Sequence, residues 1–73
     1  MGKPRHSAWD AQSVRGLRRH MHLTQEQLAE AMGVRQQTVS EWETGVYTPR
    51  GASIRLLSII ADDAEFPYRA EEP

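Results

Sequence analysis

The chain has 73 residues, a formal net charge of −1 and no cysteine. This length predicts one domain with a small core, a size at which association of two copies often supplies part of the stability. The lack of cysteine excludes disulfide frameworks and thiolate metal sites in this sequence, and it suits a reducing compartment. We expect neither a signal peptide nor a membrane span, because the most apolar stretch, residues 54–61, is short and contains Arg55 and Ser58.

The first predicted element is a helix that begins at Ser7 or Asp10 and ends at Met21, after a disordered arm over residues 1–6. Its inward side chains are predicted to be Val14, Leu17 and Met21. Gly16 in its interior costs about 1 kcal/mol relative to Ala, and the sequence gives no reason for it.

Thr24 begins the next predicted helix. Its hydroxyl can accept the Gln27 amide while the Gln27 side chain accepts the Thr24 amide, which is a capping box. Apolar residues then recur at helical spacing at Leu28, Ala31 and Met32, and Ala29 is small enough for another helix to approach closely. Gly33 fits a helix end in the left-handed conformation.

A third predicted helix follows and stops at Gly45, with Arg35 at the position where a small capping residue is expected. Val34, Val39 and Trp42 form its buried side. Four polar residues share the opposite face: Gln36, Gln37, Ser40 and Glu41. One face of this helix therefore packs and the other is free to bind.

The last predicted helix covers residues 51–62 and is apolar over more than one face. Ile54, Leu57 and Ala61 suffice to close a small core. The remaining apolar residues form a second surface that suits a two-fold dimer: Leu56, Ile59, Ile60, Phe66 and Tyr68. In the alternative interpretation, Phe66 and Tyr68 fold back over the core. We accordingly divide the chain into an arm (1–6), a domain (7–63) and an acidic tail (64–73).

The chain resembles, over roughly residues 9–61, the Cro/cI (XRE) type of helix-turn-helix transcriptional regulators. The residues that carry the resemblance are Leu23-Thr24-Gln25, Leu28-Ala29, Gly33-Val34, Thr38-Val39-Ser40, Trp42-Glu43, Gly45 and Pro49. The resemblance implies an all-α, lambda-repressor-like fold of four short helices, with a fifth left open. It also implies a cytoplasmic protein of a bacterium or phage, held at the nucleoid through DNA.

In such a protein the third helix enters the major groove of double-stranded DNA. A Gln side chain matches the N7 acceptor and N6 donor of adenine, Glu41 can accept from cytosine N4, and Arg35 can bind guanine or phosphate. The expected base-contacting residues are Gln36, Gln37, Ser40, Glu41 and Arg35. The expected phosphate-binding residues are Thr24, Gln25, Thr38, Tyr47, Thr48 and Arg50. The resemblance further implies that Gln25 braces the first recognition glutamine and that Arg18 and Glu43 form a salt bridge, whose alternative is two independent surface charges.

The charge distribution bears on the expected partner. Residues 1–61 carry eight Lys and Arg against five Asp and Glu, and residues 62–73 carry one against five. A field this modest predicts few phosphate contacts and reliance on base contacts and dimerisation. Ordinary solvated surface charge is the alternative interpretation.

Other function classes find little support. His6, His20 and His22 lack the spacing of a metal site, and no catalytic constellation is present, so we expect no cofactor, no metal and no enzymatic activity. The sequence predicts a homodimeric repressor on an inverted-repeat operator. The alternative is an antitoxin that binds a toxin protein and represses its own operon.

Overall fold

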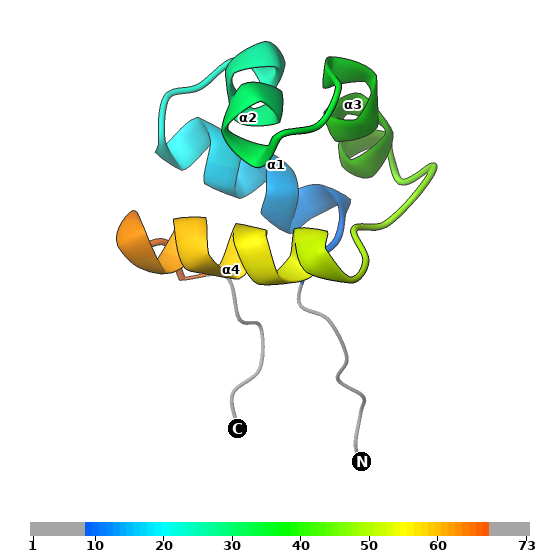
Figure 1. Cartoon of the computed structure of the whole chain (residues 1–73). Coiled ribbons are helices and arrows are strands. Elements are labelled where there is room, and N and C mark those ends of the chain that lie inside the picture. Colours follow the sequence, from blue (N-terminus) through cyan, green and yellow to red (C-terminus); the bar gives the residue numbers. More distant parts are fainter. Residues whose placement is uncertain (1–8, 68–73) are drawn as a thin grey trace.

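The computed structural model of the chain describes residues 9–67, and these form four helices. They are α1 (Ala11–His20), α2 (Gln25–Met32), α3 (Gln36–Thr44) and α4 (Ala52–Asp63). Figure 1 shows α2 and α3 next to each other on one side of the molecule, with α4 along the opposite side. The predicted all-α fold is confirmed. The predicted arm over residues 1–6 and Tyr68 lie outside the described residues.

The first two helices begin with side-chain caps. In α1 the Ser13 amide donates to Asp10 Oδ1 at 2.9 Å and the Asp10 amide donates to Ser13 Oγ at 2.8 Å. In α2 the predicted capping box is confirmed, since the Gln27 amide donates to Thr24 Oγ1 at 3.0 Å and the Thr24 amide donates to Gln27 Oε1 at 2.8 Å. Of the two predicted starts of α1, the structure therefore has the one at Asp10.

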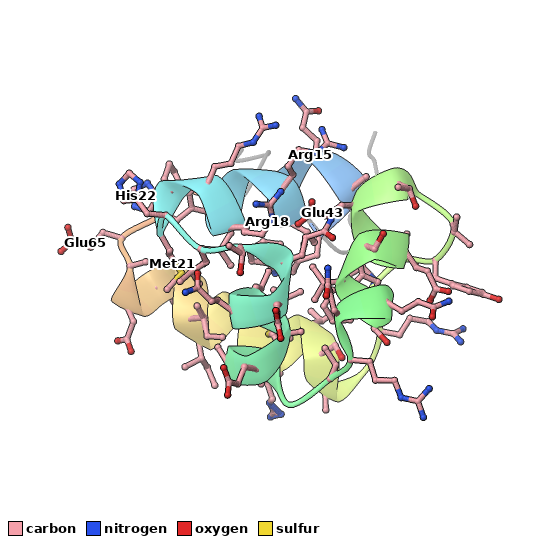
Figure 2. The ribbon with its side chains drawn as sticks, turned by 90° about the horizontal axis from the view of Figure 1, so that it is seen from above. Arg15, Arg18, Met21, His22, Glu43 and Glu65 are labelled. Atoms are coloured by element: carbon pink, nitrogen blue, oxygen red, sulfur yellow. The ribbon has the colours of Figure 1, made fainter. Side chains whose placement is uncertain are left out.

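Two helix ends use glycine and two do not. Gly33 and Gly45 follow α2 and α3 in the left-handed region, with φ of 72° and 83°. His22 and Glu65, which come soon after α1 and α4, have φ of 59° and 57° although neither is glycine. Figure 2 shows both at the same end of the molecule. The left-handed conformation is sterically unfavourable for a residue with a Cβ atom, so both positions are strained.

The core lies between the helices and includes one residue that precedes α1. Its buried apolar members are Trp9, Val14, Leu17, Leu28, Ala29, Met32, Val39, Trp42, Leu57 and Ala61. Met21, Val34 and Ile54 are half-buried against it. Trp9 Nε1 donates to Ser58 Oγ of α4 at 3.0 Å. This bond holds the segment that precedes α1 against α4.

One predicted core residue is exposed. Ala31 was expected on the inward face of α2 but faces solvent, whereas Leu28, Ala29 and Met32 are buried. At about 100° per residue, the buried arc is centred among these three, and Ala31 lies on its flank. The prediction that Ala31 packs inward was therefore wrong.

Phe66 folds back onto α1, as the alternative interpretation of the tail had it. A Cβ atom at Gly16 would lie 3.0 Å from Cζ of Phe66, so the missing side chain makes room for the ring. The ring also lies against His20, with centroids 5.3 Å apart, and His20 Nε2 is 2.9 Å from the Ala64 carbonyl oxygen. This contact gives the reason for Gly16 that the sequence did not give.

The faces of α4 can now be assigned. Leu57 and Ala61 are fully buried, Leu56 and Ile60 are half-buried against the core, and Ile59 is 55% exposed.

Within residues 9–67, no helix has the length and apolar character that a membrane crossing requires.

Candidate nucleic-acid interface

The exposed face of α3 is the centre of the candidate site. Val39 and Trp42 bury the opposite side of the helix, and α3 packs against both α2 and α1. Gln36 and Gln37 open the helix and are exposed, and Ser40 and Glu41 are half-buried one turn later. The structure thus brings these four polar side chains together on one surface, held by apolar residues behind them.

The start of α3 has no side-chain cap. Arg35 precedes the helix in an extended conformation and makes no capping hydrogen bond. Its carbonyl oxygen accepts the Thr38 amide at 3.0 Å, and the Arg35 side chain is exposed. A cation is therefore placed beside the uncapped amides at the start of α3, while Thr38 is half-buried.

On the exposed face, Gln37 and Glu41 are bonded to each other. Gln37 Nε2 donates to Glu41 Oε2 at 3.2 Å. Among the described residues, no hydrogen bond restrains the side chain of Gln36. The side chains of Gln36 and Gln37 therefore differ, because the amide of Gln37 is oriented by Glu41 and that of Gln36 is not.

The residues predicted to bind phosphate form two groups. Thr24 and Gln25 lie at the start of α2, where free amides carry partial positive charge. Tyr47, Thr48 and Arg50 lie in the connection between α3 and α4 and, with Gly45 and Val46, line a recess of about 420 Å³. All three are exposed, whereas Pro49 between them is buried and anchors the connection.

Behind this face, Glu43 joins three helices. Glu43 Oε2 accepts from Arg18 Nε at 2.7 Å and Oε1 accepts from Arg18 Nη2 at 3.0 Å, which is the ion pair implied by the resemblance. Gln25 Nε2 donates to the same Oε1 at 3.2 Å. The resemblance had Gln25 bracing Gln36; here its amide nitrogen is directed to Glu43 instead.

Arg15 was missed by sequence reasoning. Its Nη2 donates to the Glu43 carbonyl oxygen at 2.7 Å, so it caps the C-terminal end of α3 from α1. Helix α3 has no basic residue in its own last turn, and Arg15 supplies that charge. We call Arg15, Arg18, Gln25 and Glu43 the Glu43 cluster; Figure 2 shows Arg15, Arg18 and Glu43 gathered between α1 and α3.

Electrostatics keep Glu43 ionised although it is 4% exposed. Burial by itself raises the pKa of the Glu43 carboxyl, but hydrogen bonds from Arg18 and Gln25 and the charges of Arg18 and Arg15 outweigh it, so the pKa lies below its ordinary value. The bond to Glu43 likewise raises the pKa of Arg18, against burial, which lowers it. The cluster is a charged, hydrogen-bonded support that fixes the end of α3.

Comparison with known proteins agrees with this arrangement. The model of the helix-turn-helix family matches residues 14–61, which include all of α2 and α3 and most of α1 and α4. Neither the curated proteins nor the solved structures contain a match to the chain. Because the matched segment covers most of the chain and contains the α2–turn–α3 unit, this protein belongs to the Cro/cI (XRE) type of the helix-turn-helix family of DNA-binding transcriptional regulators.

Proposed function

We propose that the protein is a repressor that binds an inverted-repeat operator as a homodimer, with α3 of each copy in the major groove. The observation that carries this proposal is the exposed polar face of α3, in which Gln36 and Gln37 project from a helix whose other side is buried. A packed helix of this kind can enter a groove without losing its own contacts.

Base recognition is assigned to Gln36, Gln37, Ser40, Glu41 and Arg35. An amide offers a donor and an acceptor in one plane, which matches adenine in the major groove, and each such bidentate pair discriminates by about 1 to 3 kcal/mol. The free side chain of Gln36 can adapt to its base. The amide of Gln37 is already oriented by Glu41.

Phosphate binding is assigned to Thr24 and Gln25 at the start of α2, to Thr38 within α3, and to the recess of Tyr47, Thr48 and Arg50 after α3. Arg50 brings a full positive charge and Tyr47 and Thr48 bring hydroxyl donors. Phosphate contacts from separate segments of the chain would fix the register of α3 on the duplex.

Dimerisation is assigned to the outer face of α4, where Ile59 is exposed and Leu56 and Ile60 are partly accessible. Two copies related by a two-fold axis would place both α3 helices on one side of the duplex, with half-sites about 34 Å apart. A small dimer over a promoter represses by occupying it.

Selection of bound sequences from a random pool of double-stranded DNA tests the proposal. We expect the selected sites to share an inverted repeat. Gln37→Ala should then lower affinity for the selected site by about 1 to 3 kcal/mol and relax preference at one base pair per half-site, with binding to random DNA nearly unchanged.

Arg50→Ala is the matched comparison. Because a phosphate contact carries no sequence information, this variant should weaken cognate and random DNA alike and make the salt dependence of binding less steep. Equal effects of the two substitutions on both kinds of DNA would contradict the division between base and phosphate contacts. A pool that yields no common sequence would contradict the proposed function itself.

A further inference from the structure

The hydrogen bond between Gln37 and Glu41 fixes which way the Gln37 amide faces. A carboxylate only accepts hydrogen bonds, so the group turned toward Glu41 is the amide nitrogen of Gln37. If the amide turned by 180°, Gln37 Oε1 would face Glu41 Oε2, and two acceptors would meet. The pair thus selects one of the two amide orientations before any DNA is bound.

The selected orientation has a consequence for base recognition. The amide nitrogen of Gln37 carries two hydrogens, so the bond to Glu41 leaves one N–H donor and the oxygen acceptor of the same amide available. One donor beside one acceptor is the pattern that adenine N7 and N6 require. The reversed amide would exchange donor and acceptor, so its N–H would suit thymine O4, which accepts, in place of adenine N6, which donates.

We propose that Glu41 is a positioning residue, which acts on base recognition through Gln37 and makes that side chain specific for adenine. This inference rests on the proposed function, because it assigns a finer role within the same helix face. It differs from a direct contact of Glu41 with cytosine, for which the Gln37 amide would need no fixed orientation.

The location of the pair supports a role in recognition. Gln37 is exposed and Glu41 is half-buried, and both lie on the face of α3 opposite Val39 and Trp42. An exposed pair four residues apart adds little to helix stability. Ordering a Gln side chain on binding costs conformational entropy, however, and a bond that exists beforehand lowers that cost.

The test compares base preferences of the wild-type chain, Glu41→Ala and Glu41→Gln, by binding to every single-base variant of the selected site. Glu41→Gln is the isosteric control, because its side chain has the same length but both donates and accepts, so it can pair with either orientation of the Gln37 amide. We expect both variants to reduce discrimination for adenine at the base pair that Gln37→Ala identifies, by roughly tenfold. In a Gln37→Ala background, Glu41→Ala should change nothing further at that base pair.

The outcomes separate the two proposals. If Glu41→Gln kept the wild-type preference while Glu41→Ala lost it, an acceptor-only carboxylate would not be needed to select the amide orientation, and the positioning role would be wrong. If Glu41→Ala altered only a neighbouring base pair, Glu41 would contact that base directly, and again the positioning role would fail while the proposed function stood. If wild-type protein discriminated no base pair at all, the proposed function would fail first. Circular dichroism of each variant establishes that the fold is retained.

Discussion

Glu43 connects the end of α3 to α1 and to the start of α2. Its two carboxylate oxygens accept from Arg18 and Gln25, and its carbonyl oxygen accepts from Arg15. Arg18 Nη1 also donates to the Leu23 carbonyl oxygen at 3.1 Å, so the same guanidinium holds the connection before α2. Through one side chain, α1 and the start of α2 are therefore joined to the end of α3.

We predict that Glu43→Gln destabilises the fold. The substitution removes the ion pair and leaves Arg18, whose side chain is 18% exposed, without its counter-charge. Removing one partner of a buried pair costs about 3 to 5 kcal/mol. Because the glutamine keeps an oxygen that can accept from Arg18, we expect a loss of stability near the lower end of this range. Urea denaturation at pH 7 measures the change in the free energy of unfolding.

The same variant tests the pH dependence. The pKa of Glu43 is lowered in the folded chain, so the unfolded chain binds the proton more readily. The stabilisation is complete above the unfolded pKa of about 4.3 and is lost as pH falls through the folded value. The stability difference between wild type and Glu43→Gln should therefore shrink in acid, and a constant difference from pH 7 to pH 3 would contradict this account.

Contacts within the Glu43 cluster differ in how far sequence could predict them. The Arg18–Glu43 pair followed from family resemblance. The bond from Arg15 did not, because its acceptor is a backbone carbonyl 28 residues away and such an acceptor leaves no pattern in the sequence. Gln25 was placed in the correct region but with another partner, since the buried carboxylate attracts an amide donor more strongly than a neutral glutamine does.

At the level of helices, the sequence predicted the features that depend on neighbouring residues, but not the contacts between residues far apart in the chain. The capping box of Thr24 and Gln27 and the ends at Gly33 and Gly45 depend on residues within a few positions of one another. Gly16 shows the limit, because the ring that occupies its open side belongs to Phe66, 50 positions later. Periodicity in α1 carries no information about that contact.

Helix α3 begins without a side-chain cap, and we predict that Arg35→Ser stabilises the fold. Position 35 already has the extended conformation of a capping residue, with φ of −80° and ψ of 154°, and lacks only an acceptor. A serine there should add about 1 kcal/mol to the free energy of unfolding, measured by urea denaturation.

The same substitution removes a cation beside the residues proposed to contact bases, so it should also weaken DNA binding. Thr24→Ala, which deletes an existing cap, should lose about 1 kcal/mol and serves as the reference of opposite sign. If Arg35→Ser gained stability and kept full DNA affinity, the base or phosphate contact predicted for Arg35 would be wrong.

At the scale of the whole molecule, the structure bears on the surface proposed for a dimer. The sequence predicted a second apolar surface of five residues. In the structure, Phe66 packs on the core of its own chain, and Leu56 and Ile60 are half-buried against the same core. Helical spacing could not show which of these residues pack on the core and which stay accessible. That division depends on how the chain folds back after α4.

Ile59 is therefore the most informative position for the predicted dimer, since it is 55% exposed while its neighbour Ile60 packs on the core. We predict that Ile59→Glu gives a folded monomer whose affinity for the inverted repeat falls, because two linked half-site contacts become one, while affinity for a single half-site is unchanged. Sedimentation and gel shift measure the two effects. Val46→Glu, which places the same charge at a 62% exposed apolar residue after α3, should leave the sedimentation of the dimer unaltered. Ile60→Glu should instead unfold the chain, because Ile60 packs on the core. If the Ile59→Glu protein stayed dimeric and bound its operator normally, the dimer interface would not lie on α4.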